Sequence, residues 1–239
     1  MKSAIKSAMK SCQLGIFILL LMVLVLGSCA TKTTFEDETE EYDYALHYAL
    51  NNSNESAISS LYFKITQAEC FLSTNLSFIQ EAASEIPGMP KLLSQWTDYM
   101  NLYSMQWFEN LRSYLNNLAS SMVFTDPLAT VRQSEDSASV AFETAYREEI
   151  KTYIRQNLKD IDLSKWEELT SQYKAWVETR KVLFREENVQ LEDIDILEEF
   201  ATYICDLYFT SLKSSEVLLR TTPDPNADKT VSKVFGLNQ

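Results

Sequence analysis

Glycine is scarce in this chain, and that scarcity constrains the fold more than any other feature of the sequence. The 239 residues contain only 4 glycines and 5 prolines, and beyond residue 28 only Gly88 and Gly236 remain. The tight turns that join strands depend on glycine, so a sheet protein of this length would need many more of them. We therefore expect an all-α fold, an irregular bundle of about seven to eight helices.

The amino-terminal end of the chain has the pattern of a bacterial lipoprotein signal peptide. Lys2, Lys6 and Lys10 precede an uninterrupted apolar run over residues 16–26. Small residues before a cysteine mark the cleavage site in such signals, and the cysteine thiol carries the lipid. We expect residues 1–28 to be removed, with Leu26, Gly27 and Ser28 as the cleavage signal and Cys29 as the lipidated residue.

An uncleaved transmembrane anchor is the alternative for this segment, because residues 14–30 carry no charge. A spanning helix needs about 20 apolar residues, and the apolar run is shorter and ends in Gly-Ser-Cys, which favours the lipoprotein. In both cases the lysines at the amino-terminal end stay in the cytoplasm, and the chain after residue 28 lies outside it. The lipid on Cys29 makes the membrane a partner. Because Ala30 stands where an aspartate would resemble an inner-membrane retention signal, we expect an outer-membrane protein facing the periplasm.

The mature chain is strongly acidic. Removal of residues 1–28 leaves 18 basic against 34 acidic residues, a net charge of −16. Such a body repels phosphate backbones, so we expect no nucleic acid partner. Residues 29–43 combine the lipidated cysteine with a polar, acidic stretch that predicts a flexible tether. Residues 44–239 are expected to form a single helical domain.

Apolar residues at steps of three and four predict the helices of this domain. A short first helix over 44–50 should stop at Asn51-Asn52-Ser53-Asn54, and a second should cover 57–68. Capping residues followed by proline or by apolar residues predict starts near 125–127, 134–137 and 162–164. A long helix is expected over 91–123, another from 191–193 to Pro223, and a short closing helix over 228–236.

The helix expected over 91–123 carries an aromatic stripe that includes Tyr99, Tyr103 and Trp107. Large aromatic side chains at helical spacing are typical of a packed core. The same three residues would also suit the wall of a groove for an apolar ligand. The pattern leaves both interpretations open.

Few residues in the mature chain suit catalysis or metal binding. His47 is the only histidine and has no second histidine or Glu-x-x-His partner, so we expect no metal site, no cofactor and no enzyme. Cys70 and Cys205 remain after processing and would form either one disulfide or two buried thiols. Arg220 would meet the dipole at the end of its helix or pair with Asp126 or Asp136.

Near its carboxyl-terminal end the chain carries Glu216, Arg220 and Pro223, followed after a gap by Lys233-Val234-Phe235-Gly236. This order resembles that of a bacterial family known as domain of unknown function 4197. Members of that family close with a Glu, an Ile-Arg pair, a Pro and then Lys-Val-Phe-Gly, and the central Met-Asn and Thr-Asp pairs also agree. The resemblance implies an exported helical domain, often on lipoproteins, with no established activity. The matching residues, for which we expect structural roles, are Met100, Asn101, Thr125, Asp126, Glu216, Arg220, Pro223, Lys233, Val234, Phe235 and Gly236.

Together these features predict a membrane-anchored lipoprotein of the cell envelope. Its helical domain would be non-enzymatic and would bind an envelope protein partner or organise the envelope. The alternative is a binding module for an apolar or lipid-like ligand between aromatic-lined helices. The sequence does not indicate an oligomeric state.

Overall fold

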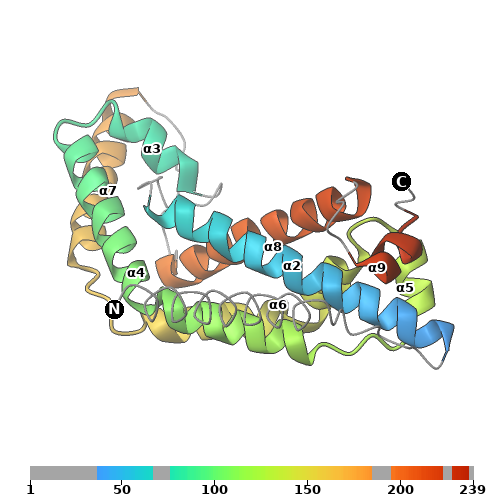
Figure 1. Cartoon of the computed structure of the whole chain (residues 1–239). Coiled ribbons are helices and arrows are strands. Elements are labelled where there is room, and N and C mark those ends of the chain that lie inside the picture. The colour runs from blue at the N-terminus through green and yellow to red at the C-terminus, as the bar shows by residue number, and fades with distance from the viewer. Residues whose placement is uncertain (1–36, 67–75, 185–194, 223–227, 237–239) are drawn as a thin grey trace, which may run out of the picture. The chain divides into compact units, whose positions relative to one another are not determined.

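Eight helices and no strand form the part of the chain that the computed structural model describes, residues 37–66, 76–184, 195–222 and 228–236. The all-α prediction is confirmed for these residues (Figure 1). The signal segment, Cys29, Cys70 and Pro223 lie outside them. The helices are α2 (Glu38–Thr66), α3 (Ser77–Ala83), α4 (Met89–Ser121), α5 (Pro127–Gln133), α6 (Ser137–Leu158), α7 (Ser164–Phe184), α8 (Ile196–Thr221) and α9 (Lys229–Val234).

The core lies between the long helices. α2 packs along α8 and α4, and α6 packs along α8, whereas α7 lies on α4 (Figure 1). The apolar stripes meet along these contacts, so Trp96, Phe108, Phe142, Phe200 and Phe209 are all buried. None of the helices in the described ranges is long and apolar enough to cross a membrane.

The predicted break at Asn51-Asn52-Ser53-Asn54 is wrong, because α2 runs through it without interruption. Asn54 is buried inside the helix, where its side chain bonds to Tyr208 on α8 and to Asn116 on α4. Asn52 donates its side-chain amide to the Tyr48 carbonyl of the preceding turn. These partners satisfy polar groups that would otherwise favour a turn, so asparagine does not end the helix here.

α2 also begins earlier than predicted, at Glu38, so residues 38–43 are helical where the sequence predicted tether. Three acidic residues in its first turn favour the positive end of the helix dipole. α9 adds tertiary contacts, because Lys233 forms an ion pair with Glu41 and the Tyr44 hydroxyl bonds to Asp228. Residues 38–43 are therefore part of the helical body and contact α9.

Most predicted helix starts are confirmed. Asp126 caps α5 by accepting a bond from the Ala129 amide at 2.9 Å, and proline follows it. Asp162 accepts from the Ser164 amide at the start of α7. α8 begins at Ile196 with Asp195 as its cap, slightly later than the predicted start. Side-chain acceptors at these positions replace the carbonyl partners that the first amides of a helix lack.

Ion pairs join α6 to α8 along their solvent-facing edges. Arg147 pairs with Asp206, Lys151 with Glu198, and Arg155 with Asp195. Lys213 on α8 pairs with Glu143 on α6, which extends the row by another turn. Because each pair joins facing turns of the two helices, the row favours one register between them.

Candidate functional site

Glu216 is a buried carboxylate at the amino-terminal end of another helix. It lies on α8, is fully shielded from solvent, and accepts hydrogen bonds from the backbone amides of Ala138 at 3.1 Å and Ser139 at 2.6 Å. Those amides belong to the first turn of α6, whose N-cap residue Asp136 makes no side-chain capping bond. Glu216 therefore caps α6 from a different helix, where a negative charge also favours the helix dipole.

Arg220 lies one turn after Glu216 on α8 and forms an ion pair with it. Its Nη1 donates to the Ser134 carbonyl at 3.0 Å, and its Cζ lies 4.4 Å from the centre of the Phe235 ring. The sequence suggested Asp126 or Asp136 as the partner, but the buried acid on the same helix face is the one within reach. We call Ser134, Glu216, Arg220 and Phe235 the Glu216–Arg220 cluster.

Burial and pairing act in opposite directions on the charges of this cluster. Burial raises the pKa of Glu216, while the Arg220 charge and the two α6 amides act to lower it. Burial likewise lowers the pKa of Arg220, and Glu216 opposes that shift. Both charges are shielded from water, so hydrogen bonds and the opposite charge must replace the lost solvation. Loss of either side chain would therefore leave an uncompensated buried charge.

A pocket of about 280 Å³ opens beside the cluster. Arg220 and Phe235 form part of its wall, together with Arg132 and Glu135. The Nε atom of Arg220 is buried and has no hydrogen-bond partner among the described residues. The wall thus carries both positive and negative side chains.

The other family-like residues are spread over the body. Met100 and Asn101 are buried on α4, Thr125 is exposed, and Asp126 caps α5. Three of them close the chain: Lys233 pairs with Glu41, Val234 lines the pocket beside Arg220, and Gly236 adopts a left-handed φ of 69°. Of the family-like residues, Glu216, Arg220 and Phe235 thus form one cluster, whereas the Met100-Asn101 and Thr125-Asp126 pairs lie outside it.

The aromatic stripe packs against the last turn of α6 and the segment that connects α6 to α7. The Tyr103 hydroxyl donates to the Asn157 carbonyl at 3.1 Å, and the Tyr99 hydroxyl accepts from the Asp162 amide at 2.9 Å. Trp107 is buried. None of the three lines either of the two pockets described here. These contacts favour the core-packing interpretation of the stripe.

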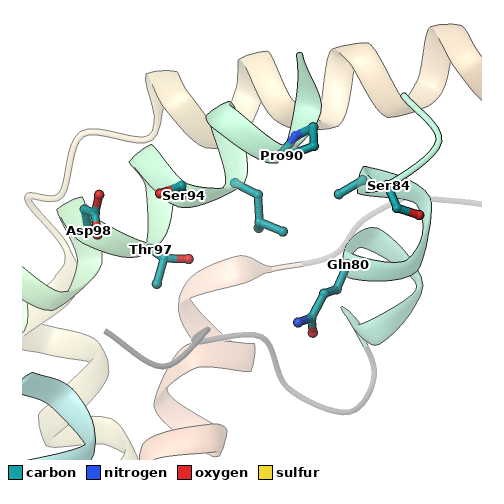
Figure 2. Close-up of a pocket in the computed structure, with 8 residues that line it drawn as sticks. Gln80, Ser84, Pro90, Ser94, Thr97 and Asp98 are labelled. Atoms are coloured by element: carbon teal, nitrogen blue, oxygen red, sulfur yellow. The ribbon is translucent and has the colours of Figure 1, made fainter. Parts of the chain in front are cut away.

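A larger pocket, of about 420 Å³, lies between α3 and α4 (Figure 2). Its apolar part is made by Ala83, Pro90 and Leu93, and its polar part includes Gln80, Thr97 and Asp98. Figure 2 shows Thr97 extending from α4 toward the space between the helices, with Gln80 on α3. The volume falls within the range of about 300–1,000 Å³ typical of small-molecule sites.

Cys205 is a free thiol, fully buried on α8. Burial raises its pKa to about 12, so the thiolate is disfavoured. Among the described residues, no group of three or more His, Cys, Asp and Glu side chains is placed to hold a metal ion. His47 lies near the start of α2, 3.7 Å from Asp43, with its ring edge against Phe124.

The capping role of Glu216 is not evident from the sequence. A signal was present, because a glutamate four residues before an arginine marks an i,i+4 pair on one helix face. The spacing alone does not distinguish a solvated pair from a buried one. The α6 amides that complete the cluster come from a segment 78 residues away.

Comparison with known proteins assigns the chain to a family. The family model described as a protein of unknown function, DUF4197, matches residues 37–236. The chain therefore belongs to this family, as its closing segment predicted. No curated protein and no solved structure matches it.

Proposed function

We propose that this chain is a lipid-anchored protein of the cell envelope whose helical body binds a protein partner and is not an enzyme. The anchor rests on the basic, apolar and Leu-Gly-Ser-Cys order of the first 29 residues. Since α2 begins at Glu38, residues 30–37 alone connect the lipidated cysteine to the body. Eight residues span at most roughly 29 Å, so the body stays close to the membrane surface.

The observation that supports partner binding is an exposed apolar patch on one side of α2 and α4. Tyr62 is 42% exposed, Leu102 64% and Met105 41%. The Tyr62 ring lies 5.0 Å from the ring of the buried Phe108 on α4. Met105 is three residues before Phe108, and Leu102 is three residues before Met105, so each neighbours the next on the helix surface. We call Tyr62, Leu102 and Met105 the α2–α4 patch. Neighbouring exposed apolar side chains of this kind are typical of interaction surfaces.

Charge indicates the kind of partner. Asp98 and Glu109 flank the patch on α4, and Glu55 lies on the same side of α2, where it pairs with Arg112. The mature chain carries a net charge of −16. A second copy of the chain would bring like charges together, whereas a partner with lysines or arginines around an apolar centre would complement the patch.

The acid and base that the structure brings together support binding over catalysis. Glu216 and Arg220 are both buried, and each is engaged with a helix end or a backbone carbonyl. Both carboxylate oxygens of Glu216 and the Nη1 atom of Arg220 are engaged in these contacts, which are structural.

Two experiments test the proposal. Growth with an azide-tagged fatty acid should label the chain, and Cys29→Ser should abolish the label while Cys70→Ser keeps it. A photoreactive amino acid at Met105 of the full chain should crosslink, in intact cells, to a lysine- or arginine-rich peptide of another protein, and Glu109→Lys should remove that product. An unlabelled chain would refute the anchor, and a crosslink that is absent, or that survives Glu109→Lys, would refute the docking surface.

A further inference from the structure

Buried polar atoms on α4 have no partner among the described residues. Both side-chain atoms of Asn101 lack a hydrogen bond although the residue is only 6% exposed, and the hydroxyl of Ser104 is in the same situation. Native proteins pair nearly all buried polar groups, so an orphaned amide needs an explanation such as a bound molecule or water. Within the described ranges, neither the amide nitrogen nor the amide oxygen of Asn101 has a hydrogen-bond partner.

The orphaned amide continues a face that already lines a pocket. Leu93, Thr97 and Asn101 follow one another at steps of four residues on α4 and therefore share one face. Leu93 and Thr97 line the 420 Å³ pocket between α3 and α4. Asn101 lies one turn beyond Thr97 and does not itself line the pocket, so only a molecule that extends past Thr97 into the helix interface would meet the Asn101 amide.

We propose that this pocket binds a small uncharged molecule with an apolar body and a terminal hydroxyl or amide. The apolar body would lie on Ala83, Pro90 and Leu93, and the terminal group would both donate to and accept from the Asn101 side chain. The charges of the site select against anions, because Asp98 lines the pocket and the mature chain is strongly acidic. Asp98 lies between this site and the α2–α4 patch, but the site uses none of Tyr62, Leu102 and Met105 and does not depend on the proposed function.

The probes are three photoreactive, alkyne-tagged alkyl chains of equal length that end in a primary amide, a carboxylate or an ammonium group. Membranes from cells that make the full chain are labelled with each, and the modified peptides are identified by mass spectrometry. The amide probe should label peptides within 80–98 at least tenfold more than the carboxylate probe. Decanamide should compete with that label. Equal labelling by all three probes would refute the proposal.

Variants separate binding from stability. Ser94→Trp places a large side chain at the exposed rim of the pocket and should abolish labelling, whereas Ser113→Trp, on an exposed part of the same helix, should leave it unchanged. Ser84→Trp blocks the other side of the pocket, and it replaces Ser94→Trp in the experiment if the Ser94→Trp protein does not accumulate in cells. Labelling that persists in the rim variants would refute the pocket.

Asn101→Leu distinguishes a ligand contact from a packing role. It removes an unpaired amide from a buried position, so the protein should melt at the same or a higher temperature. The amide probe should nevertheless label this variant at least tenfold less than the unmodified chain. Unchanged labelling in this variant would overturn the assignment of Asn101.

Discussion

The hydroxyl of Tyr208 on α8 donates a hydrogen bond to Oδ1 of Asn54 on α2, with the two oxygens 2.5 Å apart. The side-chain amide of Asn54 in turn donates a hydrogen bond to Asn116 on α4 at 2.6 Å. Three helices that are distant in sequence are thus joined by one polar chain in the core. Fully paired polar networks of this kind specify a single arrangement of the helices around them.

Replacement of Tyr208 by phenylalanine should destabilise the body by about 1–3 kcal/mol, because it leaves the Asn54 oxygen buried without its donor. Urea unfolding followed by circular dichroism measures this change. Tyr48→Phe is the matched control, since no hydrogen bond of its hydroxyl is found among the described residues, and it should change the free energy of unfolding by less than about 0.5 kcal/mol. Equal effects of the two substitutions would contradict the network.

The Glu216–Arg220 pair can be tested by a double-mutant cycle. Glu216→Leu and Arg220→Met should each cost about 3–5 kcal/mol, because each leaves the opposite charge buried and unpaired. The double variant should cost clearly less than the sum of the two. Glu135→Gln, at an exposed acid nearby, should have little effect. Additive single effects would show that the two side chains act independently.

The Cys205 thiol should resist alkylation in the folded protein. Burial raises its pKa to about 12, so at pH 8 almost no thiolate is present and iodoacetamide has no access. The folded pKa lies above the unfolded value of roughly 8.5, so this group favours the folded state below that pH and loses its contribution as the pH rises toward 12. Mass spectrometry of the peptide that contains Cys205 should show modification at least a hundredfold faster in urea. Rapid modification without urea would contradict the burial of α8.

Docking of α9 should depend on Phe235 more than on Lys233. The Phe235 ring covers the Arg220 guanidinium, and its truncation to alanine should cost about 2 kcal/mol from lost burial and a lost cation–π contact. Lys233 is exposed, and its ion pair with Glu41 is open to solvent, so Lys233→Gln should produce no measurable change. Thermal unfolding of the two variants provides the comparison, and a larger loss from Lys233→Gln would reverse this assignment.

Local signals were enough to predict the helical class and most helix boundaries. Gly88 illustrates this, because it adopts a φ of 87° just before α4, and the prolines at 87 and 90 stand on either side of it in the sequence. Asp126 and Asp162 cap their helices as their positions predicted. These features depend on residues within one turn of each other, so they can be predicted from residues that are adjacent in the sequence.

Features that depend on distant residues could not be predicted in the same way. The residues around Asn54 predict the end of a helix. Asn54 is tolerated inside α2 because its side chain accepts a hydrogen bond from Tyr208, which is 154 residues away in the sequence. Glu216 has the local character of a solvated acid, and its role appears only when the α6 amides are placed beside it. The orphaned amide of Asn101 is likewise visible only after the neighbouring helices are in position.

The capping of α6 by Glu216 has a consequence for the order of events during synthesis. A ribosome releases α6 well before α8, and the first turn of α6 therefore waits for a carboxylate made 78 residues later. A nascent chain that stops short of α8 cannot close this turn and keeps its apolar faces open. Completion of the body thus requires α8, and a truncated copy leaves the first turn of α6 without its cap.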